Sequence, residues 1–354
     1  MTDLLLLTRD LVAFPSESHA EAPFVDWIEA ELAPLDHLEV ERVGDNLVAR
    51  TTGSAPMRVL LAGHTDTVPV NGNGTPRIDG DTLWGLGATD MKAGLAVMLA
   101  LARTITAPAL EVTYVFYAAE EVAAVHNGLG HLFRDRPDLL DADVALLGEP
   151  TDGVIEAGCQ GTMRVQVTVR GRRSHTARPW MGDNAIHRLG RILAAVEAFP
   201  ERRPVLDGCE FREALQAVAV TGGVAANVVP DLATVTLNHR FAPDRTAAEA
   251  EAGLRALVEP FLEDGDEFEV VDVAGAAAPS LEHPVLQAMV ERNGLPVRSK
   301  LGWTDVARFA EHGIPSTNFG PGDATVAHMA DERVDRAPIE RCYAVLADIL
   351  TTGV

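Results

Sequence analysis

The sequence predicts an α/β fold in which a mixed sheet covered by helices forms a discontinuous domain, with a smaller α+β domain inserted into it. Two patterns support this prediction. Up to about residue 150, apolar runs typical of strands alternate with helical patterns, whereas later strands alternate polar and apolar residues. The length of 354 residues, 47% of them hydrophobic, allows a large core and favours two domains over one.

The first domain is predicted to begin with an amphipathic helix in MTDLLLLTRDLVAF, capped by Thr2 or Asp3. Further helices are expected at 92–106 and 127–134. Three of the four predicted strands are almost continuously apolar, as in a sheet that is covered on both faces. The four strands are NLVAR (46–50), VLLAG (59–63), VTYVFYAA (112–119) and VALLGEP (144–150).

The inserted domain is predicted to span residues 161–277. MRVQVTVRG (163–171) and ATVTLNHRF (233–241) alternate polar and apolar residues. Each of these strands therefore has one face in water, as in a small antiparallel sheet. Helices at 184–198 and 246–261 would cover the other face.

The pattern of the first domain returns near the end of the chain. The predicted elements there are a helix at 283–294, a short strand near 315–319 and a helix at 338–350. The first domain is therefore expected to comprise residues 1–160 and 278–354.

Composition excludes several classes of partner. The formal charge of −23 opposes binding to nucleic acid or to an anionic membrane, because both carry the same sign of charge. No apolar run reaches the length of a membrane span, and the N-terminus lacks the basic region and cleavage pattern of a signal peptide. Cys159, Cys209 and Cys342 form no CxxC pair, which fits a reducing cytoplasm.

Polar residues follow the predicted strands. His64 and Asp66 lie two residues apart at the end of VLLAG, so both side chains can point into one cleft at the carboxyl end of the sheet. On its own, such a pair is more often a hydrogen-bonded couple than a metal site. Polar residues at other strand ends and in loops make a metal site the favoured interpretation.

Five further residues have an ordinary and a functional interpretation. Asp90 precedes a helix and could be its N-cap; Glu120, Glu121 and Glu149 follow apolar strands and could be solvated; His328 lies in a glycine-bearing loop. Together they offer imidazole and carboxylate groups without thiolates, which is the ligand set of a catalytic zinc or cobalt site. One bridging acid and two further residues for each ion would hold two metals.

The motifs GHTDTVP, GATDMKAG, AAEE, GEP and the late AH resemble, in order and spacing, the M20 family of metal-dependent aminoacylases and carboxypeptidases. The resemblance covers essentially the whole chain and includes RGRRSHTARPWMGDNAIH (170–187) in the inserted domain. It implies a dizinc catalytic domain and a lid domain through which two subunits form a homodimer.

The resemblance also implies roles for individual residues. Asp90 would bridge two zinc ions, for which cobalt can substitute, and the peptide bond that follows it would be cis. His64 and Glu149 would complete the coordination of one ion, and Glu121 and His328 that of the other. The further implied roles are Glu120 as general base, Asp66 as the residue that orients His64, His175 as oxyanion donor, and Arg240, Asn227, Arg178 and Thr304 as substrate contacts.

The implied reaction is hydrolysis of an N-acylated amino acid. TDMKAG, CQGTMRVQVTVRG and GWTDVARF are most similar to the branch that acts on N-succinyl-LL-2,6-diaminopimelate, in lysine and diaminopimelate biosynthesis. One departure is Cys159 and Gln160, where relatives can carry arginine, so recognition of the succinyl carboxylate would use other residues.

Two alternative functions remain open. One is the deacetylation of acetylornithine, or hydrolysis of another N-acyl amino acid. The other is a catalytically silent, metal-containing binding protein, against which the presence of Glu120 argues. The chain has neither GxSxG nor HExxH, and GLG at 85–87 lacks the third glycine of a dinucleotide loop, so a serine hydrolase or dehydrogenase is not expected.

Overall fold

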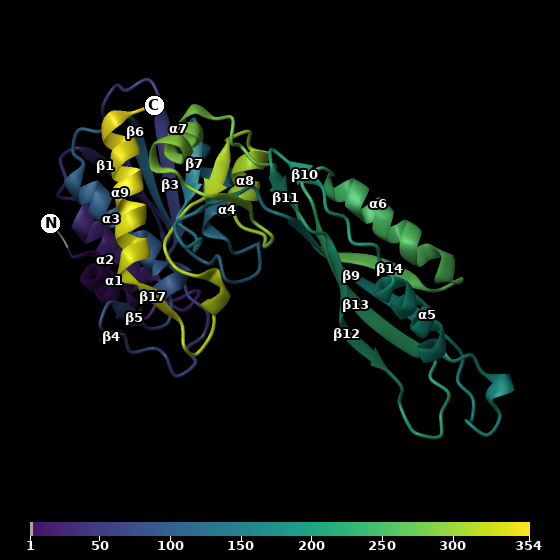
Figure 1. Cartoon of the computed structure of the whole chain (residues 1–354). Helices are drawn as coiled ribbons and strands as arrows, with labels where there is room; N and C mark the ends of the chain where they lie inside the picture. The colour runs from purple at the N-terminus through teal and green to yellow at the C-terminus, as the bar shows by residue number, and fades with distance from the viewer. Residues whose placement is uncertain (1–2) are drawn as a thin grey trace. The chain divides into compact units, whose positions relative to one another are not determined.

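The computed structural model describes residues 3–354 (Figure 1). The chain divides into two compact units. The first comprises Met1–Ala157, Pro279–Arg298 and Arg308–Val354, and the second comprises Gly158–Ala278 and Ser299–Ala307. The short segment Ser299–Ala307 thus packs with the second unit although it follows part of the first in sequence. The α/β fold class predicted from the sequence is confirmed.

An eight-stranded mixed sheet forms the centre of the first unit, in the order β1-β2-β6-β3-β7-β16-β8-β15. The four strands from β6 to β16 in this order run parallel, and β1, β2 and β8 pair antiparallel. The strands are β1 (Leu38–Val43), β2 (Asn46–Thr51), β3 (Arg58–His64), β6 (Glu111–Tyr117), β7 (Val144–Leu147), β8 (Ile155–Ala157), β15 (Val297–Ser299) and β16 (Ser316–Asn318).

Strands β3, β6 and β7 are buried along nearly their whole length, because both faces of the sheet are covered. A small three-stranded sheet, β17-β5-β4, completes the unit; its strands are β4 (Arg77–Asp79), β5 (Thr82–Trp84) and β17 (Arg333–Asp335). The helices are α1 (Leu4–Val12), α2 (Ala22–Leu32), α3 (Ala93–Thr104), α4 (Gly128–Asp135), α7 (Pro284–Asn293), α8 (Val306–Glu311, which begins in the second unit) and α9 (Arg336–Thr352).

The predicted N-terminal helix is present as α1. The Asp3 carboxylate accepts hydrogen bonds from the backbone N–H groups of Leu5 and Leu6, as an N-cap does. The alternative cap, Thr2, lies outside the described residues. Within residues 3–354, every helix is too short or too polar to cross a bilayer.

The second unit is built on a four-stranded antiparallel sheet in the order β12-β13-β9-β14, and helices α5 and α6 pack on it. β9 and β13 alternate between buried and less buried residues, as predicted for a sheet with one wet face. The elements are β9 (Gly161–Arg170), α5 (Ala185–Glu197), β10 (Val205–Leu206), β11 (Cys209–Glu210), β12 (Ala214–Gly222), β13 (Leu232–Phe241), α6 (Ala247–Val258) and β14 (Glu267–Ala274).

The core of this second unit contains an isolated imidazole. His239, on the buried face of β13, is 1% exposed and lies against the rings of Phe199 and Phe241, at centroid distances of 5.6 and 5.9 Å. Neither ring nitrogen has a hydrogen-bond partner among the described residues. Burial, with a smaller effect from the charge of Arg245, lowers the pKa of His239 from 6.5 to about 4.

We therefore expect the stability of the protein to fall in mild acid. The unfolded chain gains a proton at residue 239 below pH 6.5, whereas the folded chain does so only near pH 4. Stability should therefore decrease as the pH falls through this interval, by roughly 3 kcal/mol in total. Urea unfolding between pH 7.5 and 4 should show a weaker pH dependence for H239F than for the wild type. The control is H187N, at an exposed position of α5, which should behave like the wild type. If stability depended on pH equally in H239F and H187N, His239 would not be the source of the effect.

Candidate metal centre

The predicted ligands gather at the carboxyl ends of the parallel strands in the first unit. β3 ends at His64, β6 is followed by Glu120 and Glu121, β7 by Glu149, and the chain beyond β16 leads to His328. Because these four strands are parallel and adjacent, their carboxyl ends lie along one edge of the sheet. The fold thus brings residues from distant parts of the sequence to one edge.

Asp90 lies between two imidazoles. Its Oδ1 is 3.0 Å from Nε2 of His64, and its Oδ2 is 3.4 Å from Nε2 of His328. His328 Nε2 also lies 2.8 Å from Oε1 of Glu121. The possible ligand atoms of His64, Asp90 and Glu121 all lie within 4.8 Å of one another, close enough to hold a metal ion.

The cluster carries an excess of negative charge. Hydrogen bonds to Asp90 and Glu121 raise the pKa of His328 to about 10. Burial would lower the pKa of His64, but hydrogen bonds to Asp66 and Asp90 and the charge of Glu149 raise it well above its ordinary value. Both imidazoles thus favour a positive charge at this point, and a bound cation would supply it.

The ring of His64 is oriented by contacts at Nδ1, the nitrogen that does not face Asp90. Its Nδ1 lies 3.1 Å from the backbone carbonyl oxygen of Asp66 and 3.6 Å from that residue's carboxylate. A ring that donates from Nδ1 presents the lone pair of Nε2 towards Asp90. The backbone of Asp66 is therefore the nearer orienting group, and its carboxylate makes other contacts.

That carboxylate holds the segment beyond β6. Oδ1 of Asp66 accepts a hydrogen bond from the N–H of Glu120 at 3.0 Å, and Oδ2 accepts one from the N–H of Glu121 at 3.1 Å. The hydroxyl of Ser18 donates to Oδ2 at 2.7 Å. Burial alone would raise the pKa of Asp66, but His64 and these donors lower it to about 2, so the group is a carboxylate at neutral pH.

Two further side chains extend this arrangement, and sequence reasoning missed both. Oδ1 of Asn46 accepts the N–H of Ala118 at 3.0 Å, and Oε1 of Glu21 accepts the N–H of Ala119, also at 3.0 Å. Ala119 has a positive φ of 58°. Four consecutive N–H groups, from residue 118 to residue 121, are thus bonded by side chains of three other segments.

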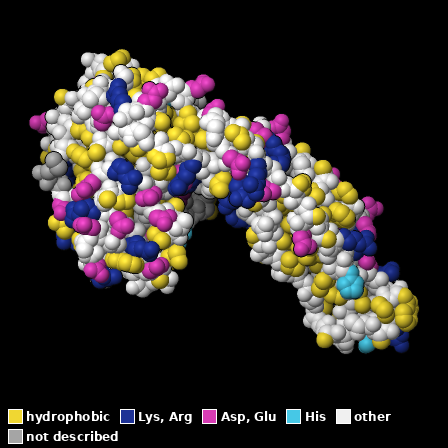
Figure 2. Space-filling view, in the orientation of Figure 1, with side chains coloured by type: hydrophobic (Ala, Val, Ile, Leu, Met, Phe, Trp, Pro, Cys, Tyr) yellow, Lys and Arg dark blue, Asp and Glu magenta, His cyan; other side chains and the backbone are white. Residues whose placement is uncertain are grey.

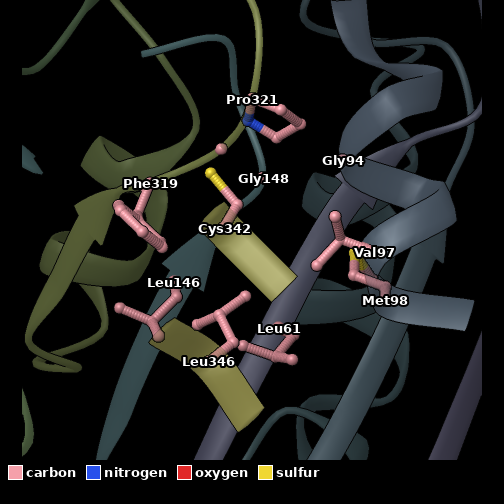
Figure 3. Close-up of a pocket in the computed structure, with 11 residues that line it drawn as sticks. Leu61, Gly94, Val97, Met98, Leu146, Gly148, Phe319, Pro321, Cys342 and Leu346 are labelled. Atoms are coloured by element: carbon pink, nitrogen blue, oxygen red, sulfur yellow. The ribbon is translucent and has the colours of Figure 1, made fainter. Parts of the chain in front are cut away.

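Close packing brings the start of α3 to the end of β7. A Cβ on Gly94 would lie 2.3 Å from the carbonyl oxygen of Gly148, so a larger residue would push the two elements apart. Figure 3 shows both glycines beside a small apolar cavity of about 10 Å³, between side chains of α3, α9, β3 and β7. The peptide bond between Asp90 and Met91 is cis, as the resemblance implied.

The remaining predicted residues belong to the second unit. His175 forms a β-bridge with Val228, and the neighbouring N–H of Thr176 donates to the carbonyl oxygen of Asn227. The N–H of Arg178 donates to the carbonyl oxygen of His175, so these three predicted residues lie in one loop cluster.

Arg240 and Thr304 are placed by other contacts. Arg240 lies on β13 opposite Thr162 of β9. The carbonyl oxygen of Thr304 accepts a contact from Sγ of Cys159 at 3.7 Å. Both residues are thus close to the start of β9, next to Cys159 and Gln160.

A profile of peptidase family M20/M25/M40 matches residues 60–352. The succinyl-diaminopimelate desuccinylase of Corynebacterium glutamicum is 44% identical, covering 99% of this chain and 96% of that protein. A Mycobacterium tuberculosis chain that carries the name of the same enzyme is 51% identical, covering 94% of this chain and 93% of its own length.

Two solved structures share the fold. A tripeptidase from Staphylococcus aureus has a TM-score of 0.81 at 21% identity, covering 99% of this chain and 97% of that one. An M20 metallo-carboxypeptidase from Sulfolobus solfataricus has a TM-score of 0.77 at 16% identity, covering 99% of each chain. The fold and the family resemblance predicted from the sequence are confirmed.

The role of Asp66 as a backbone acceptor leads to a stability prediction. In D66N, the amide nitrogen faces one of the two backbone N–H groups and cannot accept a hydrogen bond from it. We expect the metal-free variant to lose about 1–3 kcal/mol of unfolding free energy, because a buried donor loses its partner. Urea unfolding at pH 7 measures this loss. S18A removes a donor to the same carboxylate and should cost less; a D66N protein as stable as the wild type would contradict the interpretation.

Proposed function

The chain belongs to peptidase family M20/M25/M40, and we propose that it hydrolyses N-succinyl-LL-2,6-diaminopimelate to succinate and LL-2,6-diaminopimelate, a step of lysine and diaminopimelate biosynthesis. The substrate follows from the names of the relatives at 44% and 51% identity. The single structural observation that carries a metal-dependent hydrolysis is the position of the Asp90 carboxylate between the imidazoles of His64 and His328.

M20 metallopeptidases are metal-dependent, and we propose that this chain binds two zinc ions, which cobalt can replace. Asp90 would contact both ions. His64 and Glu149 would complete one site, and Glu121 and His328 the other. The donors fit, because imidazole and carboxylate without thiolate suit a catalytic zinc site, and the surplus negative charge of the cluster is what a pair of cations would balance.

When bound, such ions lower the pKa of a coordinated water and polarise an amide carbonyl. The residues of the chain would perform the remaining steps. Glu120 would take the proton of the attacking water and return it to the departing amine nitrogen, as a general base and then a general acid. The hydrogen bond from its N–H to Asp66 fixes the backbone from which this side chain projects.

We propose that the second unit supplies substrate contacts. His175 would donate a hydrogen bond to the oxyanion, and Asn227 and Arg178 lie in its loop cluster. Burial and the nearby charge of Arg164 lower the pKa of Arg240, and no carboxylate pairs with its guanidinium within residues 3–354. Arg240 therefore suits a carboxylate of the substrate, and Thr304, whose buried hydroxyl has no partner in the described chain, suits a second polar contact.

We also propose a homodimer that forms through the second unit. β12 is an edge strand of its sheet, and nearly all of its side chains are exposed, including Val218 at 57% and Val220 at 51%. Trp180 and Met181, elsewhere in the same unit, are also exposed, and Figure 2 shows hydrophobic side chains on the surface of this unit. An open apolar edge strand invites pairing with a second copy.

We propose a cytoplasmic location for the enzyme. Cys159, Cys209 and Cys342 are all free and buried, which is the state that a reducing compartment maintains. The proposed substrate is a small molecule of amino-acid synthesis, so the reaction requires neither nucleic acid nor a membrane.

Substrate choice tests the proposed function directly. The zinc-loaded protein should hydrolyse N-succinyl-LL-2,6-diaminopimelate with a kcat/KM at least about 100-fold above that for N-acetylornithine, because a succinyl group offers a carboxylate for which a matching polar site discriminates strongly. Release of the free amine measures both rates. Faster turnover of acetylornithine would assign the chain to deacetylation, and no turnover of any N-acyl amino acid would favour a binding protein.

Glu120 and Glu121 should give opposite results although they are neighbours. E120Q should lower kcat by about 10²–10⁴-fold with metal content unchanged, because the base is lost and the ligands remain. E121Q should lower the metal content itself. Metal analysis after gel filtration, combined with the amine assay, separates the two. Full activity in E120Q would refute its role as general base.

The dimer prediction has a matched control on the opposite edge of the same sheet. V220K places a charge on β12, whereas V271K places one on β14 at a side chain that is also 51% exposed. Analytical ultracentrifugation of the wild type and V271K should give twice the chain mass of 37.8 kDa, and V220K should shift towards the single chain. A wild-type monomer would contradict the proposal.

A further inference from the structure

A buried carboxylate outside the proposed ligand set contacts the backbone of Asp90. Glu332 is 1% exposed, and its Oε1 accepts hydrogen bonds from the N–H groups of Thr89, at 3.0 Å, and of Asp90, at 3.1 Å. The backbone of Asp90 is not helical, with φ −124° and ψ 93°. Its N–H therefore has no acceptor in a helix, and a buried N–H requires one from elsewhere.

Glu332 also lies in the segment that carries His328. β17 begins at residue 333 and pairs antiparallel with β5, and the carbonyl oxygen of Glu332 extends this pairing by accepting the N–H of Gly85 at 3.0 Å. The residues after Gly85 lead to Asp90, and the residues before Glu332 lead back to His328. The two loops that contribute these side chains thus run beside each other from a common ladder.

A second residue links the same two loops, to one through its side chain and to the other through its backbone. Nδ2 of Asn73 donates to the carbonyl oxygen of Met329 at 3.1 Å, while the carbonyl oxygen of Asn73 accepts the N–H of Leu86 at 2.9 Å. Asn73 thus connects the segment next to His328 with the segment that leads to Asp90. Glu332 makes the link that is nearer to Asp90, because it bonds the N–H of that residue itself.

We propose that Glu332 is a positioning residue of the metal centre, which ties the Asp90 loop to the His328 loop and so sets the separation of their side chains before metal binds. This inference rests on the proposed function, since it assumes that Asp90 and His328 are ligands. Its physical basis is that ordering the loops in advance removes a cost that metal binding otherwise bears. Groups that orient ligands affect metal affinity by about 10–100-fold.

Two substitutions distinguish the effect of the length of the Glu332 side chain from the effect of its charge. E332Q keeps the length of the side chain and an acceptor oxygen but loses the charge, whereas E332D keeps the charge and withdraws the oxygen by one methylene. The control is D331A, at the adjacent exposed acid that pairs with Arg333. Zinc affinity is measured on the metal-free proteins by competition with a chromophoric chelator, and a urea unfolding curve is recorded for each variant.

We expect E332D to bind zinc about 10–100-fold more weakly than the wild type, while E332Q stays within about threefold and D331A is unchanged. At saturating zinc, E332D should recover most of its kcat, because the proposed role of Glu332 acts through metal binding. If E332D does not fold, N73A removes the other side-chain link between the same loops and should weaken zinc binding in the same direction.

Different results would contradict the positioning role and the proposed function. Wild-type affinity in E332D, or in N73A where E332D is unfolded, overturns the positioning role. Weak binding by E332Q together with normal binding by E332D would assign Glu332 a purely electrostatic role and also overturns it. A wild-type protein that does not bind two zinc ions refutes the proposed function itself, independently of any variant.

Discussion

The geometry of the centre depends on the hydrogen bonds that hold the backbone directly beyond β6. Here the chain leaves the sheet, and the N–H groups of residues 118–121 lose the partners that a strand would supply. Asn46, Glu21 and Asp66 accept all four of these hydrogen bonds. Asp66 itself follows β3 by two residues, so its carboxylate joins the ends of two neighbouring parallel strands. The positions of Glu120 and Glu121 relative to His64 therefore follow from one buried group.

Burial disfavours the charged form of the carboxylates that accept these hydrogen bonds, and the same effect favours cation binding at the centre. Burial raises the pKa of Glu21, and the charge of Asp66 adds to the effect. Burial likewise raises the pKa of Glu332 to about 7, with a contribution from Asp90. Glu21 thus repels Asp66, which orients His64, and Glu332 repels the proposed ligand Asp90; this repulsion is strongest without cations. The same residues that arrange the site therefore create the demand for positive charge that metal ions would meet.

The extent to which the fold could be predicted depended on burial patterns. Continuous apolar runs predicted β3, β6 and β7, and alternation predicted β9 and β13, because those strands face a core on two sides or on one. β12 escaped prediction because almost all of its residues are exposed, so no face of the strand selects apolar side chains. β8 and β15 are three residues long and too short to establish a period.

The site, like the fold, contains residues that the sequence pattern predicted and residues that it did not. Strand ends and motif order predicted His64, Asp90, Glu121 and His328, and the structure brings these four side chains together. Glu21, Asn46 and Glu332 were not predicted, because their partners are backbone N–H groups, which carry no mark in the sequence. Every residue type except proline presents such an N–H, so only the folded chain reveals which acid faces a protein donor and which faces water. Asp331 and Glu332 are adjacent in sequence, yet one is exposed and the other buried.

The net charge of −23 sets a further constraint on how the proposed substrate binds. N-succinyl-diaminopimelate carries three carboxylates, so the field of the protein as a whole repels it. Most arginines cannot offset this repulsion, because acidic neighbours already pair with them, as in the network of Arg202 with Glu213 and Asp244. Arg240 differs, since it is partly desolvated and the largest charge effect on its pKa comes from another arginine, Arg164. An arginine held in this way gains most from an incoming anion. The arginines without acidic partners, Arg240 among them, therefore suit the carboxylates of the proposed substrate better than the paired arginines do.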